Sequence, residues 1–138
     1  MEFNNKKKRL GDILIDAGVI NKQQLDIALT TQIEKGQKLG ETLIDLEYTT
    51  EVEIATALHR QLNIDYIILS DRLLDAEIIN LVGEEILRKH SVIPFEFKKG
   101  HPNVLRVAMS NPLDFVAIDD IAIVTNFQIE PAVATSQD

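Results

Sequence analysis

The sequence contains no cysteine and no tryptophan, and aromatic residues make up only 5% of its 138 positions. Without cysteine the chain can form no disulfide, so its fold depends on a hydrophobic core, for which 45% hydrophobic residues are available. Lack of cysteine is also typical of proteins that work in a reducing compartment. We therefore expect a globular cytoplasmic protein of one domain, or of two small subdomains.

Long apolar runs are also absent, and the charged start is followed by amphipathic sequence rather than by a signal-peptide pattern. We therefore expect no direct insertion into a membrane. Basic residues are scarce, with 14 Lys and Arg against 22 Asp and Glu. This balance argues against binding DNA or RNA, which relies on neutralising many phosphates. The basic run at Lys6, Lys7 and Lys8 is interpreted as part of a disordered tail over residues 1–8.

Patterns that would support catalysis or metal binding are missing as well. His59, His90 and His101 are scattered without the spacing of metal ligands, and no nucleophilic triad can be argued from the sequence. The stretch "GQKLGET" has the wrong glycine spacing for a phosphate-binding loop and places Glu41 where such a loop needs lysine. The sequence therefore predicts a protein that is not an enzyme.

What the chain does contain is a repeat. Residues 9–32 read "RLGDILIDAGVINKQQLDIALTTQ", and residues 38–61 read "KLGETLIDLEYTTEVEIATALHRQ". The copies lie 29 positions apart and are separated by the residues "IEKGQ". Repetition at this period predicts two copies of one structural unit.

Each copy has the signals of two helices. Apolar residues keep a 3.6-residue period, and Gly18 is a typical helix stop between the two helices of the first copy. Asn21 with Gln24, and Thr50 with Glu53, have the spacing of capping boxes that begin the second helix of each copy. The sequence therefore predicts four helices, as two similar pairs, over residues 9–62.

The pattern changes after about residue 62. A short apolar strand is predicted at "IDYIIL" (64–69), and helix at 75–90 with an interruption at Gly83. The stretch "SVIPFEFKKGHPNVLRVAMS" predicts two strands joined by a turn, followed by a helix capped by Asp114 and a strand in "FQIEPAVAT". We predict an α+β fold, with a four-helix tandem repeat followed by a small β-β-α-β subdomain over residues 63–138.

The opening of each copy favours an anionic ligand. A helix start offers unpaired backbone N–H groups, and a glycine lets a ligand approach the backbone closely. Arg9 offers a planar fork that can grip a phosphate, or the O6 and N7 atoms of guanine, with two hydrogen bonds. Lys38 offers only a point charge at the corresponding position. The two copies are therefore predicted to contribute unequally.

The second helix of each copy offers apolar side chains four residues apart, followed by glutamine. Such a stripe can support the flat face of a base, worth on the order of 1 to 2 kcal/mol of burial, and a glutamine amide both donates and accepts hydrogen bonds. The same spacing is ordinary for a helix core, and glutamine near a helix end is ordinary on a surface, so the residues alone leave both interpretations open. The positions are Leu25, Leu29 and Gln32 in the first copy and Ile54, Leu58 and Gln61 in the second.

With Arg/Lys-Leu-Gly, spaced aliphatics and a terminal Gln in both copies, the sequence resembles the N-terminal domain of type II secretion and type IV pilus assembly ATPases. More narrowly, it resembles the MshE-type (MshEN) variant that binds cyclic di-GMP, and the stretch from "VIPFEF" to "PAVAT" resembles the rest of that domain. The resemblance implies a regulatory cyclic di-GMP receptor, without another cofactor, attached to or partnered with such an ATPase. It implies a cytoplasmic location, peripheral to the inner membrane only through partners.

The resemblance also implies a ligand-binding set in which each copy holds one half of a two-fold ligand. Asn111 or Asp114, in the loop after the last hairpin, is implied as an additional acceptor for guanine N1 and N2. The alternative is a docking domain of the same fold that binds no nucleotide, which would keep the leucines as core without needing the Arg, Gly and Gln pattern. The implied set is Arg9, Leu10, Gly11, Leu25, Leu29, Gln32, Lys38, Leu39, Gly40, Ile54, Leu58 and Gln61.

Overall fold

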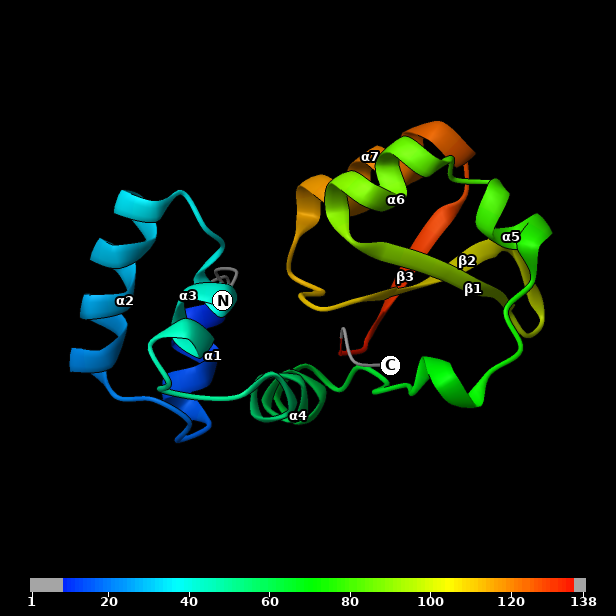
Figure 1. The fold of residues 1–138 in the computed structure, drawn as a ribbon. Coiled ribbons are helices and arrows are strands. Elements are labelled where there is room, and N and C mark those ends of the chain that lie inside the picture. The colour runs from blue at the N-terminus through cyan, green and yellow to red at the C-terminus, as the bar shows by residue number, and fades with distance from the viewer. Residues whose placement is uncertain (1–8, 136–138) are drawn as a thin grey trace, which may run out of the picture. The chain divides into compact units, whose positions relative to one another are not determined.

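Helices build the first of two units in the computed structural model, which describes residues 9–135. The units are Met1–Asn63 and Ile64–Asp138, and the second contains the sheet (Figure 1). The predicted α+β class is therefore confirmed. The disordered tail predicted at residues 1–8 lies outside the described residues. Within residues 9–135, no helix combines the length and apolar character needed to cross a membrane.

The predicted capping boxes begin the second helix of each copy. Asn21 Oδ1 accepts a hydrogen bond from the Gln24 backbone N–H at 2.8 Å, and Gln24 Oε1 accepts from the Asn21 N–H at 3.0 Å. Thr50 Oγ1 accepts from the Glu53 N–H at 3.2 Å. These boxes satisfy backbone donors that a helix start leaves unpaired. The helices are α1 (Leu10–Asp16), α2 (Lys22–Lys35), α3 (Leu39–Asp45) and α4 (Glu51–Leu62).

The two copies of the repeat interlock. α2 packs against α3 and α1 packs against α4, so the second helix of each copy lies on the first helix of the other copy. α1 and α3 also contact each other, and Figure 1 shows this pair next to α2 and α4. Leu14 of α1 and its repeat equivalent Leu43 of α3 are both fully buried. The two copies therefore contribute to one shared core.

Between the two helices of each copy, the chain turns at a residue with a left-handed backbone conformation. Gly18 holds a φ of 77° in the first copy, and Glu47, its equivalent 29 positions later, holds 63°. Glycine adopts this backbone region without a steric cost, whereas a residue with a Cβ is strained by about 1 kcal/mol there. The second copy therefore keeps the turn despite having lost its glycine.

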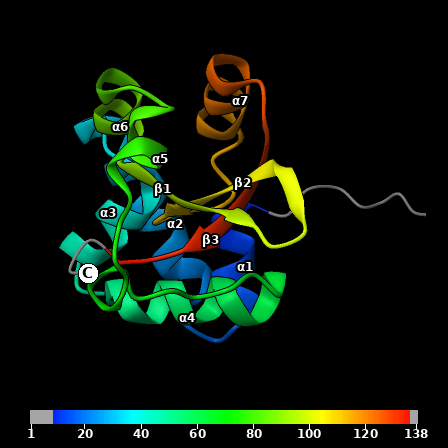
Figure 2. The same cartoon turned by 90° about the vertical axis from the view of Figure 1, so that its right-hand side faces the viewer.

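The second unit is a three-stranded sheet with helices, within the described residues. The strand order is β1-β2-β3, with β1 and β2 antiparallel and β2 and β3 parallel. The parallel pair needs a crossover, which α7 provides, and Figure 2 shows α7 and α6 side by side beyond the sheet. The elements are α5 (Ala76–Asn80), α6 (Glu84–His90), β1 (Val92–Lys98), β2 (His101–Met109), α7 (Phe115–Thr125) and β3 (Gln128–Val133).

Each face of the sheet has its own apolar cluster, because side chains alternate along a strand. The helices α5, α6 and α7 cover one face, where Leu105 and Val107 of β2 pack against Ala117 and Ile121 of α7. The other cluster, in which three of the five residues are alanine, is Ile67, Phe95, Ala108, Ala132 and Ala134.

The prediction of a strand at residues 64–69 is wrong. Only an isolated bridge forms there, between Tyr66 and Val133. The Ile67 N–H donates to the Val133 carbonyl at 2.9 Å, and the Val133 N–H donates to the Asp65 carbonyl at 2.8 Å. A 3₁₀ turn over Leu69–Asp71 then leads the chain away. The apolar residues suit the sheet edge, but the turn ends the ladder before a strand is established.

Arg106 joins this edge segment to the sheet. Its guanidinium lies 2.6 Å from Asp65 Oδ2 and 2.6 Å from Glu96 Oε2, and 5.1 Å from the centre of the Phe95 ring. Arg106 Nε is 3.1 Å from Glu130 Oε2, but this N–H is not aligned for a hydrogen bond. Burial alone would lower the pKa of Arg106, but the hydrogen bonds and charges of Glu96 and Asp65 outweigh it and raise that pKa above its ordinary value. Arg106 is therefore a permanent cation holding three segments together.

Candidate ligand-binding site

The two basic residues that open the repeat are available on the surface. Arg9 and Lys38 take the N-cap positions of α1 and α3 with extended backbone, and both are exposed. Neither side chain forms an ion pair with another residue of the described range 9–135. Within the described residues, each copy therefore presents one cation that forms no ion pair of the fold.

The glycines of the two openings lie among apolar side chains. A Cβ added at Gly11 would lie 2.7 Å from Leu25 Cδ1, which is closer than real contacts allow. A Cβ at Gly40 would be in ordinary contact, 3.8 Å from Leu10 Cδ2 and 3.9 Å from Ile54 Cδ1. The structure thus brings Leu10 of the first copy beside Gly40 of the second. It also gives Gly11 a packing role that the sequence pattern did not reveal.

Most of the predicted apolar shelf is part of the core. Leu25 and Ile54 are buried, and Leu58 of the second copy has an exposed fraction of 0%. Leu29, its equivalent in the first copy, has an exposed fraction of 40%. Among these four positions, only Leu29 already presents a large part of its side chain to a ligand. Leu10 is also buried and Leu39 half-buried.

The two glutamines lie in the last turns of their helices. Gln32 of α2 is half-buried, and Gln61 of α4 is exposed. No side-chain hydrogen bond of either amide to another residue of the described part of the chain is formed. Both amides are therefore able to donate to and accept from a ligand, as the pattern requires.

Asn111 and Asp114 belong to the second unit and have local roles. Asn111 Oδ1 accepts from the Leu113 N–H at 3.0 Å, and Asp114 Oδ1 accepts from the Ala117 N–H at 3.2 Å, which caps α7 as predicted. Each side chain thus already orders its own loop.

Thr42 supports the second opening, and the sequence pattern missed it. The Oγ1 of this fully buried residue lies 3.0 Å from the Lys38 carbonyl oxygen and 3.3 Å from Gln37 Oε1. Its single hydroxyl proton donates to one of these two acceptors at a time. Gln37 Nε2 in turn donates to Asp45 Oδ2 at 2.9 Å. The signal was present, because Thr42 is a polar residue at the position that Ile13 holds in the first copy.

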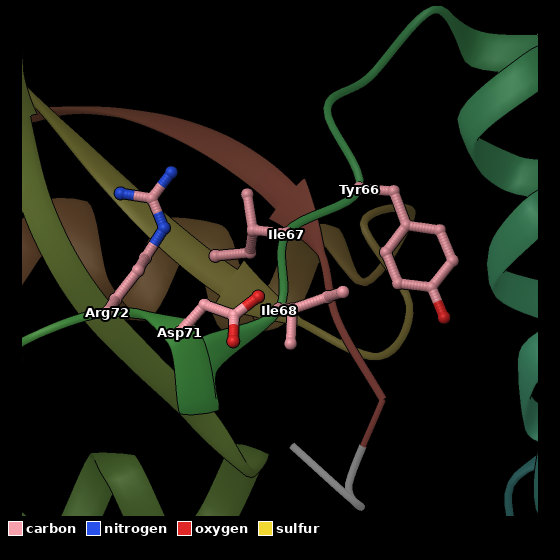
Figure 3. A pocket seen from close by; sticks show the side chains of 5 residues that line it. All are labelled: Tyr66, Ile67, Ile68, Asp71 and Arg72. Atoms are coloured by element: carbon pink, nitrogen blue, oxygen red, sulfur yellow. The ribbon is translucent and has the colours of Figure 1, made fainter.

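A shallow pocket elsewhere does not involve the predicted site. It lies on the second unit, where Tyr66, Ile67, Ile68, Asp71 and Arg72 line it (Figure 3). Figure 3 shows Tyr66 and Arg72 extending to opposite sides of Ile67. The Arg72 guanidinium bonds Glu96 at 3.2 Å, so it serves the fold rather than an open site.

Comparison with known proteins gives the family. The family model described as the MshEN domain matches residues 62–138, more than half of the chain. The chain belongs to the MshEN domain family. This MshEN chain also resembles the solved structure of MshE with cdg, with 31% identity and a TM-score of 0.76, over 95% of this chain and 93% of that one. A structure of the N-terminal domain of XpsE matches 96% of this chain and 92% of its own, with a TM-score of 0.72, but at 15% identity it shows the fold alone.

The curated relatives are much longer than this MshEN chain. The type IV pilus assembly ATPase PilB of Myxococcus xanthus is 32% identical over 127 residues, which is 92% of this chain and 22% of that protein. PilB of Thermus thermophilus is 31% identical over 124 residues, which is 90% of this chain and 14% of that protein. The chain therefore spans less than a quarter of the length of these ATPases.

Proposed function

We propose that this MshEN domain is a receptor for cyclic di-GMP. The observation that carries the proposal is the complete double motif, with Arg9 and Lys38 exposed and without ion pairs in the described range. Cyclic di-GMP has two guanines and two phosphates related by a two-fold axis, so two equivalent openings match its symmetry. The similarity to MshE, whose structure was solved with cdg, supports the same ligand.

The first copy supplies the stronger half of the proposed site. Arg9 grips a phosphate or a guanine edge with two bonds, Leu29 offers an apolar surface to the base, and Gln32 pairs with polar groups at its edge. In the second copy Lys38 offers only a point charge, and Leu58 is fully buried in the core. The first copy therefore contributes most of the affinity, and the second completes the enclosure of the ligand.

The regulated machine in this proposal is a type IV pilus or type II secretion assembly ATPase. Its support is the similarity to PilB, of which this chain matches only a small part. The domain itself acts as a sensor in the cytoplasm, and hydrolysis of ATP belongs to another part of the machine. Binding of the ligand stabilises the state of the domain that binds it best, and so biases the attached motor.

Isothermal titration calorimetry of the whole chain with cyclic di-GMP tests the proposal. We expect saturable binding at micromolar protein, at least tenfold weaker for Arg9→Ala, because a charge-assisted bidentate contact is worth about 1.5 to 3 kcal/mol. Lys22→Ala removes the same charge from an exposed position on α2 and serves as the matched control, with unchanged affinity.

Gly40→Ala separates ligand approach from packing. The added methyl group meets only ordinary contacts in the structure, so we expect folding to be retained and binding to be weakened if the ligand lies against this backbone. Absence of binding heat for the folded wild-type chain at moderate salt would refute the receptor proposal and leave the docking domain as the function.

A further inference from the structure

The outward face of α7 carries large apolar side chains. Ile123 has an exposed fraction of 79% and Val116 one of 65%, and Phe115 and Val124 are exposed as well. The opposite side of the helix holds the fully buried Ala117 and Ile121, which pack on the sheet. Soluble domains rarely expose such a contiguous group of apolar side chains without a binding role.

A carboxylate lies within this apolar face. Asp119 is four residues from both Phe115 and Ile123, so the three side chains form one stripe along the helix. Asp119 is exposed and has no hydrogen bond or ion pair with another residue in the described range 9–135. Asp120 differs, because its Oδ2 lies 2.8 Å from His90 Nε2 and 3.9 Å from Lys89 Nζ.

No positive charge of the same segment compensates Asp119. The sequence has no Lys, Arg or His after Arg106. An occupant of this face therefore needs aliphatic groups for Val116 and Ile123, together with one cation that reaches Asp119. Burying Asp119 without such a cation would leave a desolvated and unpaired charge, which is costly.

Two other occupants fit poorly. An anionic membrane surface would be repelled by Asp119 and by the net charge of −8 of the chain. A second copy packed face to face about a two-fold axis through this stripe would bring Asp119 against its own equivalent, and like charges oppose such a contact.

We propose that the outward face of α7 is a docking surface for an amphipathic helix of a partner protein, in which aliphatic residues one turn apart flank a lysine or arginine. Val116 and Ile123 contact the aliphatic residues, and Asp119 forms an ion pair with the cation. The apolar contacts supply most of the affinity, and the ion pair fixes the position of the partner helix. This surface is made of α7 residues, whereas the nucleotide site proposed above uses residues of the first unit.

A pair of synthetic peptides tests the docking surface. Each is about 18 residues long, to allow a helix, with leucine along one face and either lysine or glutamate elsewhere. Backbone amide shifts of the whole isotope-labelled chain report where each peptide binds. We expect saturable shifts centred on residues 115–124 with the lysine peptide and none with the glutamate peptide.

Matched variants separate docking from general attraction to an acidic protein. Ile123→Ser is expected to weaken binding of the lysine peptide about five- to tenfold, and Asp119→Asn about two- to fivefold. Ile33→Ser, at the 81% exposed Ile33 of α2, and Glu85→Gln, on α6, should leave its affinity unchanged. Circular dichroism confirms that each variant is folded, and unchanged cyclic di-GMP binding by Ile123→Ser would keep this surface distinct from the nucleotide site.

Three results would overturn the proposal. The first is the absence of shifts at residues 115–124. The second is an equal loss of affinity in the α7 variants and in the two control variants, which would indicate non-specific attraction. The third is a concentration-dependent dimer that Ile123→Ser abolishes, which would make this face an interface between copies of the chain.

Discussion

Truncating the two equivalent leucines of the repeat separates a ligand contact from a core contact. Leu58 is completely buried, whereas Leu29 is 40% exposed. Removing a fully buried leucine side chain costs about 2 to 5 kcal/mol, because the transfer free energy is lost and a cavity remains. Leu29 is partly in solvent already, so Leu29→Ala should cost about 1 kcal/mol.

Ligand binding should show the opposite order, with Leu29→Ala weakening it more than Leu58→Ala. If a guanine lies on Leu29, its truncation removes apolar contact worth about 1 to 2 kcal/mol, or roughly 5- to 30-fold in Kd. Leu58→Ala should bind nearly as well as the wild type at temperatures where it is still folded. Urea unfolding gives the stabilities, and calorimetry at low temperature gives the affinities.

Two results would refute this reasoning. Unchanged affinity of Leu29→Ala for cyclic di-GMP would mean that the exposed leucine is not the base-stacking surface. Equal destabilisation by both substitutions would mean that Leu58 contributes no more to the core than Leu29 does. The pair is informative because both positions carry the same residue at the same place in the repeat, so helix propensity and side-chain chemistry cancel.

Three further outcomes are expected. Arg9→Ala should weaken cyclic di-GMP binding more than Lys38→Ala in calorimetry, since a bidentate grip is lost; equal losses would contradict the asymmetry of the copies. Glu47→Gly should raise the free energy of unfolding by about 0.5 to 1 kcal/mol in urea, because the left-handed φ no longer strains a side chain, and a lower stability would show that Glu47 has another role. Arg106→Ala should destabilise the chain by about 1 to 3 kcal/mol. A raised arginine pKa means that this cation's contribution is complete below its unfolded-state value and is lost only in strong alkali, so the destabilisation should be equal at about pH 6 and about pH 9; a difference between these pH values would contradict the assignment.

The parts of the fold that follow local rules were predictable. Asn21 and Thr50 begin helices with the expected partners, Asp114 caps α7, and Gly83 lies between α5 and α6. These features depend on residues a few positions apart, whose effect on the backbone is known from short segments.

Features that depend on distant residues were not predictable. The Arg106 cluster joins Asp65, Glu96 and Glu130, which lie on three separate segments of the chain. The bridge at Tyr66 failed to extend into a strand because backbone geometry at the sheet edge, rather than the apolar composition of residues 64–69, decided its length.

The sequence predicts the candidate site as a set of residues, but it does not predict how accessible each of them is. The repeat gives Leu29 and Leu58 the same expected role, yet Leu29 is exposed and Leu58 is fully buried. Burial depends on which helices pack together, and the exchange in which α2 lies on α3 and α1 on α4 has no signature in the period of 29. The close packing of Gly11 of α1 on Leu25 of α2, within the first copy, also depends on how two helices pack and was hidden for that reason.

This exchange has a consequence during protein synthesis. A ribosome releases α1 and α2 before α3 and α4, yet each early helix needs a late one as its neighbour. Two short helices by themselves are marginal in water, so we expect the nascent first half to stay unstructured until α4 has emerged. Cutting the chain between the copies is accordingly expected to unfold the helices of both copies, rather than to yield two weaker half-receptors, while the unit over Ile64–Asp138 keeps its own core.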